Sequence, residues 1–399
     1  MRVLELAQIM AGPTCGMLLA DMGADVIKVE KLTGGDDARG YAQPSINGES
    51  APFLMLNRNK RGIALDLKHP QGRDVLLRLA ARADVLTENF RAGTMERFGL
   101  GADVLMAANP ALIYCAISGY GRSGPDAAKG GFDLIAQGFA GLMSITGEAG
   151  GPPVKNGNPV ADINAGILAA LGIVAAWAHR LQTGQGQVVD TSLAEAALQQ
   201  TYWQAAIQLA TGVSPGPTGS AHVLTAPYQA FAAADGWINI GGANQANWER
   251  IAEVLGHPEW CADARFASNA ARMANRPALV AAMSAVLSTR GRTDWLAAFD
   301  AAGVPAGPVH SIGEALAHPQ MRARGMVVET THPRAGVTRS LGCPIHFSAT
   351  PTRVGRAAPM LGEHSRAVLH EHGYADAEID ALEAAGVIAS AAGSGGRDE

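Results

Sequence analysis

Residues 1–30 read MRVLELAQIM AGPTCGMLLA DMGADVIKVE, and this stretch decides the fold class. The apolar run at residues 3–6 predicts a strand, and the turn at Gly12-Pro13-Thr14 separates it from a helical pattern that ends near Met22. Residues 24–30 are again rich in β-branched residues. A strand, a helix and a second strand joined by short connections form a βαβ unit with two parallel strands.

The same alternation continues downstream. Strands are predicted at residues 62–67, 83–87 and 112–118, with a helix at residues 69–82 after the first of them. Repeated strand–helix alternation is typical of an α/β fold with a doubly wound, mostly parallel sheet. We therefore expect a large Rossmann-like domain to contain this half of the chain.

The second half predicts a smaller α+β domain. An apolar helix from Asp162 to about Leu181 is expected to be buried, and a long helix should run to about Thr211. A hairpin turn at Asp235-Gly236 and helices at 247–255 and 276–287 follow. The expected organisation is a large domain of residues 1–211 and 325–399, a linker at 212–225, a small domain at 226–311 and a linker at 312–324, with a frayed tail from residue 391.

Composition excludes several classes of function. The 399 residues are 48% hydrophobic and 17% charged, with a net charge of -5, so no large basic surface is expected for nucleic acid. The N-terminal residues lack the pattern of a signal peptide, and no uninterrupted apolar run is long enough to cross a bilayer. We expect a cytoplasmic protein that binds neither nucleic acid nor membranes.

Common cofactor motifs are also missing from the sequence. The four cysteines are scattered, no metal-ligand spacing is present, and His370 and His372 would point to different faces of a helix, so no metal site is expected. The sequence contains no P-loop, no Gly-x-Gly-x-x-Gly after the first strand and no Gly-x-Ser-x-Gly. ATP-driven enzymes, plain dinucleotide enzymes and α/β-hydrolases are therefore disfavoured.

Several short segments, spread in order over nearly the whole chain, carry the strongest functional signal of the sequence. They are Met10-Ala11-Gly12-Pro13, residues 19–30, residues 57–61 with 65–68, residues 83–91, residues 118–121 with Gly124-Pro125, Pro159-Val160-Ala161-Asp162, residues 183–187, Gly307-Pro308-Val309 and Leu361-Gly362-Glu363-His364. Together they resemble the class III CoA-transferases, the family of formyl-CoA transferase and of the carnitine and bile-acid CoA-transferases.

The resemblance implies that Asp162 is the catalytic nucleophile. It implies covalent transfer through an aspartyl anhydride and an aspartyl-CoA thioester, with acyl-CoA and a small carboxylic acid as substrates and no tightly bound cofactor. By position alone, an aspartate at the start of an apolar helix is more often an N-cap than a nucleophile. The two roles are compatible, because a helix N-terminus is expected to keep a carboxylate ionised for attack.

The remaining site residues are implied by the same resemblance. Backbone N–H groups of Ile9 and Met10 would bind the oxyanion. Residues that would bind CoA are Lys31, Leu65, Lys68, Asn89, Phe90 and Arg97, although a lysine or arginine taken alone is more often a solvated surface residue. Phe132 would form an aromatic wall, Asp133 would either orient a substrate or be structural, and Gly241, Gly242 and Ala243 would form a loop that closes over the site or a simple strand-ending turn.

Two other functions stay open at this point. Racemases of the same fold have a Gly-His-Asp segment where this chain has Gly131-Phe132-Asp133, and a phenyl ring cannot exchange protons, so transfer is favoured over α-methylacyl-CoA racemisation. A non-catalytic CoA-binding protein would be expected to lack Asp162. The resemblance further implies an interlocked homodimer. Gln8, Met10 and Pro52 differ from the residues of formyl-CoA transferase at these positions, so the formyl-CoA and oxalate pair is disfavoured. A small dicarboxylate such as succinate, itaconate or mesaconate is expected instead.

Overall fold

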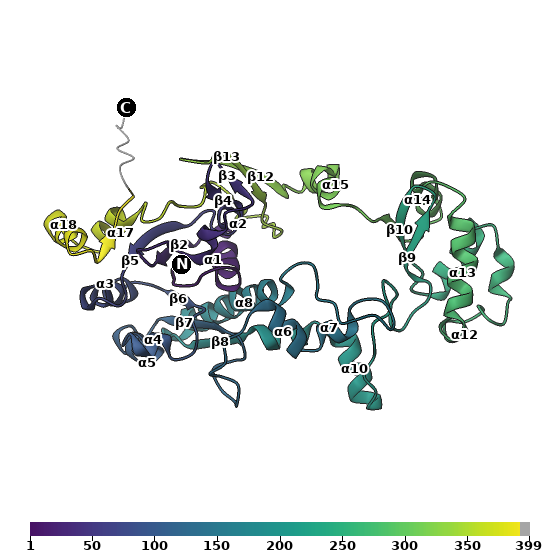
Figure 1. Ribbon diagram of the computed structural model, residues 1–399, viewed down its shortest axis with the longest axis horizontal. Helices are drawn as coiled ribbons and strands as arrows, with labels where there is room; N and C mark the ends of the chain where they lie inside the picture. The colour runs from purple at the N-terminus through teal and green to yellow at the C-terminus, as the bar shows by residue number, and fades with distance from the viewer. Residues whose placement is uncertain (392–399) are drawn as a thin grey trace. The chain divides into compact units, whose positions relative to one another are not determined.

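The computed structural model describes residues 1–391 and divides them into two compact units. The first unit contains Met1–Ala140, Gly157–Gln200 and the chain from Pro319 onward. The second contains Gly141–Asn156 and Thr201–His318. Figure 1 shows the helices and strands of the chain, and each unit has its own hydrophobic core. Apart from Ala391, the predicted tail lies outside the described residues.

The first unit is built on a seven-stranded sheet with the order β14-β5-β2-β1-β6-β7-β8. Its strands are β1 (Arg2–Glu5), β2 (Asp25–Glu30), β5 (Arg61–Leu65), β6 (Val85–Glu88), β7 (Ile113–Ser118), β8 (Val188–Ser192) and β14 (Ile388–Ala389). All neighbouring strands are parallel except β14, which is antiparallel to β5. The prediction of a large, mostly parallel sheet is confirmed. Because β2 and β5 follow β1 on one side and β6 lies on the other, the strand order reverses between β1 and β6.

Helices and short strands complete the first unit. The helices are α1 (Ala11–Asp21), α2 (Ala51–Leu56), α3 (Pro70–Ala80), α4 (Thr94–Arg97), α5 (Ala102–Ala108), α6 (Asp133–Phe139), α8 (Val160–Thr183), α9 (Leu193–Gln199), α16 (Pro319–Ala323), α17 (Ser365–Glu371) and α18 (Asp376–Ala384). The further strands form two hairpins, β3 (Ser45–Ile46) with β4 (Glu49–Ser50) and β12 (Val327–His332) with β13 (Gly336–Leu341). A 3-10 turn covers Asp37–Gly40.

Helix α8 differs from the prediction at its start and in its burial. It begins at Val160 after Pro159, so Asp162 is its third residue and not its N-cap. One face of α8 is rich in small residues and packs against α1, α9, β7 and β8. The opposite face is not buried within the chain, since Leu171 is 64% exposed. Complete burial was predicted from an all-round apolar pattern, which does not identify which partner covers each face.

Helix α8 is also the one helix of the described residues that is long and apolar enough to cross a membrane by length and composition. This corrects the expectation that no such segment exists. The structure explains its character without a membrane, because its small-residue face forms part of the core between α1 and the sheet.

The second unit has a three-stranded sheet of order β11-β10-β9. The strands are β9 (Tyr228–Ala233), β10 (Gly236–Gly241) and β11 (Ala306–Pro308), and the helices are α7 (Leu142–Ile145), α10 (Tyr202–Thr211), α11 (Gln245–Val254), α12 (Asn269–Ala274), α13 (Arg276–Leu287), α14 (Arg292–Ala301) and α15 (Ile312–Ala317), with a 3-10 turn at Pro258–Cys261. The predicted hairpin between β9 and β10 is confirmed. The predicted single helix up to Thr211 is wrong, because α9 ends at Gln199 and α10 is separate. Residues 212–225 contain no helix or strand, whereas α15 and α16 occupy most of 312–324.

Candidate active site

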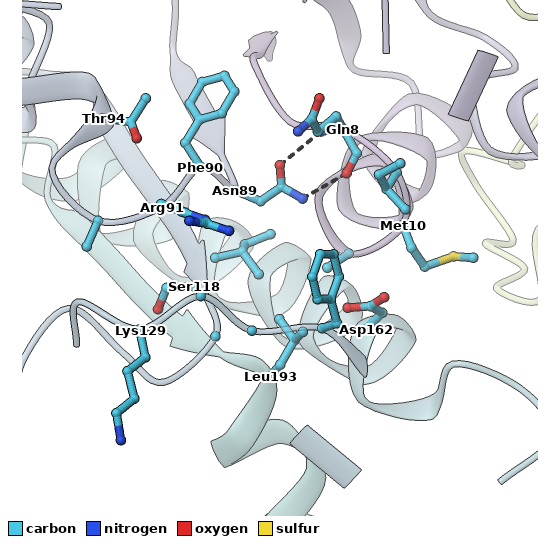
Figure 2. A pocket seen from close by; sticks show the side chains of 18 of the residues that line it. Gln8, Met10, Asn89, Phe90, Arg91, Thr94, Ser118, Lys129, Asp162 and Leu193 are labelled. Atoms are coloured by element: carbon cyan, nitrogen blue, oxygen red, sulfur yellow. Dashed lines mark hydrogen bonds between the residues drawn. The ribbon is translucent and has the colours of Figure 1, made fainter. Parts of the chain in front are cut away.

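A cavity of about 440 Å³ lies in the first unit where the strand order reverses. Its walls come from the segments that follow β1, β6 and β7 and from the first turn of α8 (Figure 2). In open α/β sheets, ligands bind outside the carboxyl ends of the strands at this reversal. The topology therefore predicts a site at the position where the cavity lies.

Asp162 forms part of the cavity wall, and it is a half-buried acid with an unusual pKa. Burial, followed by repulsion from the nearby Asp133 carboxylate, raises the pKa of Asp162 to about 7. The expectation that the helix N-terminus holds this carboxyl ionised is thus wrong in direction. A helix dipole contributes about 0.3–1 kcal/mol near the first turn, which is less than desolvation removes.

Asp133 has a structural role in the fold of this site. Its Oδ1 accepts the backbone N–H of Ala161 at 2.9 Å, and its Oδ2 accepts the Gln137 side-chain amide at 2.6 Å. Asp133 therefore caps the start of α8 from α6, although it stands 28 positions before Ala161. Of the two roles open for Asp133, the structure favours the structural one.

The segment between β1 and α1 contains free backbone donors, shifted by one residue from the prediction. Ile9 donates its N–H to Asp36 Oδ1 at 2.9 Å, so the expectation that Ile9 binds an oxyanion is wrong. Among residues 1–391, the N–H groups of Met10, Ala11 and Gly12 have no hydrogen-bond partner, and no side chain caps α1. Met10 and Ala11 line the same cavity as Asp162. These unpaired donors at a helix start are suited to stabilise negative charge.

Asn89 connects the loops that follow β1 and β6. Its Oδ1 accepts the Gln8 N–H at 2.9 Å, and its Nδ2 donates to the Gln8 carbonyl at 2.8 Å (Figure 2). This reciprocal pair engages both ends of the Asn89 amide. The side chain of Asn89 therefore positions the cavity wall, and both of its polar atoms bind the Gln8 backbone.

A second cavity of about 200 Å³ adjoins the first. Four predicted CoA-binding residues line it, namely Lys31, Leu65, Lys68 and Phe90. The two cavities share Gln8, Phe90 and Thr94. The structure thus brings most of the predicted CoA residues together, next to the cavity that contains Asp162. Arg97 lines neither cavity, but its Nη2 donates to Thr94 Oγ1 at 2.8 Å, on the shared wall.

Phe132 and a close backbone contact shape another part of the wall of the larger cavity. Phe132 lines the larger cavity and is 72% exposed, which fits the expected aromatic wall. The backbones of Gly119 and Gly131 cross there so closely that a methyl group added at Gly131 would lie 2.6 Å from Gly119 Cα. Larger residues at either position would move Phe132.

Two cations in the cavity wall were missed by the sequence analysis. Arg91 points its guanidinium toward the middle of the cavity, whereas the Lys129 amino group points away from Asp162 (Figure 2). Lys129 also forms an ion pair with Asp126 at 2.7 Å. The position of Arg91 directly after Asn89-Phe90, at the end of a predicted strand, was the signal that could have identified it.

The predicted substrate loop belongs to the second unit. Gly241 ends β10, and the N–H of Gly242 donates to the Pro227 carbonyl at 2.7 Å. A methyl group added at Gly242 would lie 2.7 Å from that carbonyl oxygen, so this turn requires glycine. Closure of Gly241–Ala243 over a site stays a prediction.

Comparisons with known proteins identify the family of this chain. The model of CoA-transferase family III matches residues 1–365. The chain is 41% identical to succinate–glutarate CoA-transferase of Agrobacterium fabrum over 93% of this chain and 94% of that protein. It is 38% identical to succinyl-CoA:mesaconate CoA-transferase of Haloarcula hispanica over 94% of this chain and 96% of that protein. A crystal structure of a CAIB/BAIF family protein from Brucella suis superposes with a TM-score of 0.83 at 39% identity, covering 93% and 98% of the two chains. The chain therefore belongs to CoA-transferase family III and is a class III CoA-transferase.

Proposed function

We propose that this enzyme transfers CoA from an acyl-CoA to a small dicarboxylic acid, with Asp162 as the covalent nucleophile. The observation that carries the proposal is the arrangement of the larger cavity. A half-buried carboxyl group with a pKa near 7 and the free N–H groups of Met10 and Ala11 line one cavity, and the adjoining cavity contains Lys31 and Lys68. A nucleophile, oxyanion donors and phosphate-binding cations are the groups that this reaction requires.

The proposed chemistry balances without an added reactant. The Asp162 carboxylate attacks the thioester carbonyl and the C–S bond breaks. This step releases CoA thiolate and forms a mixed anhydride between Asp162 and the first acid. The thiolate attacks the aspartyl carbonyl of that anhydride, which releases the first acid and leaves an aspartyl-CoA thioester. The acceptor carboxylate then attacks the aspartyl-CoA thioester, which releases CoA thiolate and forms a second mixed anhydride. Attack of the thiolate on the acceptor carbonyl of this anhydride yields the new acyl-CoA and free Asp162. No net proton or phosphate is consumed.

The free N–H donors act on the tetrahedral intermediates of each step. Every step places negative charge on a carbonyl oxygen that was neutral before attack. Loss of one such donor typically lowers turnover by about 10²–10³-fold. Met10 and Ala11 replace the Ile9 and Met10 pair that the sequence predicted, because Asp36 engages Ile9.

Arg91 supports a dicarboxylic acid as the substrate class. Its guanidinium lies in the cavity wall and has no ion-pair partner among residues 1–391. A guanidinium can bind a carboxylate through two parallel hydrogen bonds. A dicarboxylic acid has a second carboxylate for this contact while the first one reacts, whereas a monocarboxylic acid has none left. Similar enzymes are named for succinate, glutarate and mesaconate, which are dicarboxylic acids.

We propose a homodimer whose interface includes the apolar surface of the first unit. Helices α6 and α8 pack together and leave large apolar side chains uncovered, including Phe139 at 61% and Leu171 at 64% exposure. Exposed apolar patches of this kind mark protein interfaces. A molar mass of two chains in analytical ultracentrifugation is expected.

The deciding experiment tests the class of acceptor acid and the nucleophile together. The enzyme is incubated with succinyl-CoA or glutaryl-CoA and a panel of dicarboxylic and monocarboxylic acids, and new acyl-CoA is read by mass spectrometry. A parallel reaction with hydroxylamine should place a hydroxamate on the peptide that contains Asp162. Label on another carboxylate would contradict the nucleophile, and transfer to monocarboxylic acids at equal rates would contradict the substrate class.

Racemisation has no comparable support in the site. Two-base racemisation needs a second proton-transferring group beside the α-carbon. Phe132 supplies none, and Asp133 is engaged with Ala161 and Gln137.

A further inference from the structure

Four charged side chains are completely or almost completely buried beneath the start of α1. Glu5 and Lys28, which are paired residues of β1 and β2, lie 3.1 Å apart. Lys28 contacts Asp36 at 2.8 Å, and Lys60 contacts Glu5 at 2.8 Å. The four side chains are at most 1% exposed. We call Lys60, Glu5, Lys28 and Asp36 the buried ion chain.

The buried ion chain holds the segment between β1 and α1 at several points. Lys28 Nζ donates to the Ala7 carbonyl at 2.8 Å, and Lys60 Nζ donates to the Pro13 carbonyl at 3.0 Å. Asp36 Oδ1 accepts the Ile9 N–H at 2.9 Å. The free N–H groups of Met10 and Ala11 lie between these fixed points, on the cavity wall.

Ile9 has a backbone conformation that its side chain opposes. Its φ is +66°, in the left-handed region. A β-branched residue is rare there, and such strain costs about 1–3 kcal/mol unless surrounding contacts enforce it. The hydrogen bond to Asp36, whose carboxylate is itself fixed by Lys28 and by the Ala38 N–H at 2.9 Å, supplies such a contact.

We propose that the buried ion chain is a positioning device for catalysis, in which Asp36 locks Ile9 in its left-handed conformation and thereby directs the Met10 and Ala11 N–H groups into the cavity with Asp162. Asp36, Lys28, Glu5 and Lys60 are thus positioning residues. The inference rests on the proposed function, since the donors matter only if carbonyl chemistry occurs at Asp162.

Stability alone is a poor explanation for this chain of charges. Burying an ion pair costs desolvation that its attraction often only balances, and apolar residues of the same volume are frequently as stable. A buried ion chain that contacts three backbone groups of one strained segment instead fixes geometry. Gly16 of α1 supports this interpretation, because a methyl group added there would lie 1.7 Å from Glu5 Oε2. Helix α1 therefore packs directly against the buried ion chain.

The test is a double-mutant cycle between Asp36 and Ile9. Asp36→Ala removes the acceptor for Ile9 and should lower kcat about 100-fold, the scale of a lost oxyanion donor. Asp36→Asn keeps an oxygen acceptor and should lower kcat about tenfold or less. Glycine adopts positive φ without steric cost, so in an Ile9→Gly background the Asp36→Ala change should cost less than about tenfold in kcat.

A matched control separates positioning from lost stability. Asp21 forms a buried ion pair with Arg58 at 2.5 Å, at the far end of α1. Asp21→Ala should lower the melting temperature at least as much as Asp36→Ala and leave kcat at 25 °C within about twofold of wild type. The CoA dissociation constant is measured for each variant, because Asp36 borders the smaller cavity although its carboxylate is 1% exposed.

Defined outcomes overturn the inference. A normal kcat in Asp36→Ala would do so, as would equal fold-losses from that change in the Ile9 and Ile9→Gly backgrounds. If Asp36→Ala does not fold, the same comparison is made with Asp36→Leu, which also lacks an acceptor for the Ile9 N–H and fills more of the space left by aspartate. Asp162→Asn is assayed in parallel: full activity there would overturn the proposed function, whereas an inactive Asp162→Asn with a normal Asp36→Ala would overturn this inference alone.

Discussion

Replacing Asp162 by asparagine should abolish transfer and stabilise the folded protein above pH 7. Asparagine resembles the protonated acid in shape but cannot ionise. In the folded protein, burial and the charge of Asp133 raise the pKa of Asp162 from its usual value of 3.8 to about 7. The wild-type protein must therefore ionise an acid in a poorly hydrated position, and the variant avoids that cost.

The pH window follows from these two pKa values. Below about pH 4, Asp162 is protonated in the folded and unfolded states and costs nothing. Between pH 4 and 7 the unfolded chain releases the proton first, so wild-type stability falls progressively, and above pH 7 the loss is complete. A tenfold change in an acid dissociation constant corresponds to about 1.4 kcal/mol, which gives about 4 kcal/mol, or about 2–4 kcal/mol after allowing for solvent at this half-buried group.

Denaturant unfolding at pH 4, 6 and 8 measures the effect. The two proteins should be equally stable at pH 4, and Asp162→Asn should be the more stable by about 2–4 kcal/mol at pH 8. Asp294, an exposed residue in the first turn of α14, offers a matched control, and Asp294→Asn should change the free energy of unfolding by less than about 0.5 kcal/mol. Parallel stability curves for wild type and Asp162→Asn from pH 4 to 8 would refute the reasoning.

Three further predictions follow from the site. Lys68→Ala and Arg97→Ala should each weaken CoA binding by about 5- to 100-fold, measured by calorimetry, and an unchanged dissociation constant in both would place the nucleotide elsewhere. Because Phe132 supplies no base, a 2-methylacyl-CoA in deuterated water should show no stereospecific exchange at its α-carbon by NMR, and rapid exchange with inversion would contradict this. Gly166→Ala should destabilise the protein by about 1–3 kcal/mol and slow turnover, because the new methyl group would lie 2.4 Å from the Ala11 carbonyl oxygen, while Gly157→Ala, with nothing within 4 Å, should do neither.

The sequence predicted the sheet well because its strands carry a local signal. Residues 3–6 and 24–30 are apolar runs flanked by turn residues, and they form the adjacent strands β1 and β2. Family resemblance likewise located Asp162, Lys31 and Lys68 around adjoining cavities. Information of this kind lies within a short stretch of chain or in a motif shared by a family.

The errors concern hydrogen bonds between residues that are distant in sequence. Ile9 was expected to offer a free N–H, and Asp36, 27 positions away, engages it. The sequence allows two roles for Asp133, and the hydrogen bond that it accepts from the Ala161 N–H favours the structural one. Asp162 is suited to cap a helix because Asp is favoured at that position, but α8 begins two residues earlier, at Val160, and its N-cap is Pro159. No local pattern encodes which donor meets which acceptor across such separations.

The direction of the Asp162 pKa and the unpaired donors of α1 fit together chemically. A carboxylate that accepted these N–H groups in the resting enzyme would have a low pKa and would be a weaker nucleophile. Among residues 1–391, Met10 and Ala11 instead leave their N–H groups unpaired, while burial keeps Asp162 basic. In the proposed mechanism the reacting carbonyl oxygen becomes negative only after attack, so donors held back from the resting carboxylate stabilise the transition state more than the ground state. The same donors would then stabilise the negative charge on the Asp162 carbonyl oxygen when thiolate attacks the anhydride. One pair of N–H groups at one helix start is therefore sufficient for a reaction with several acyl transfers.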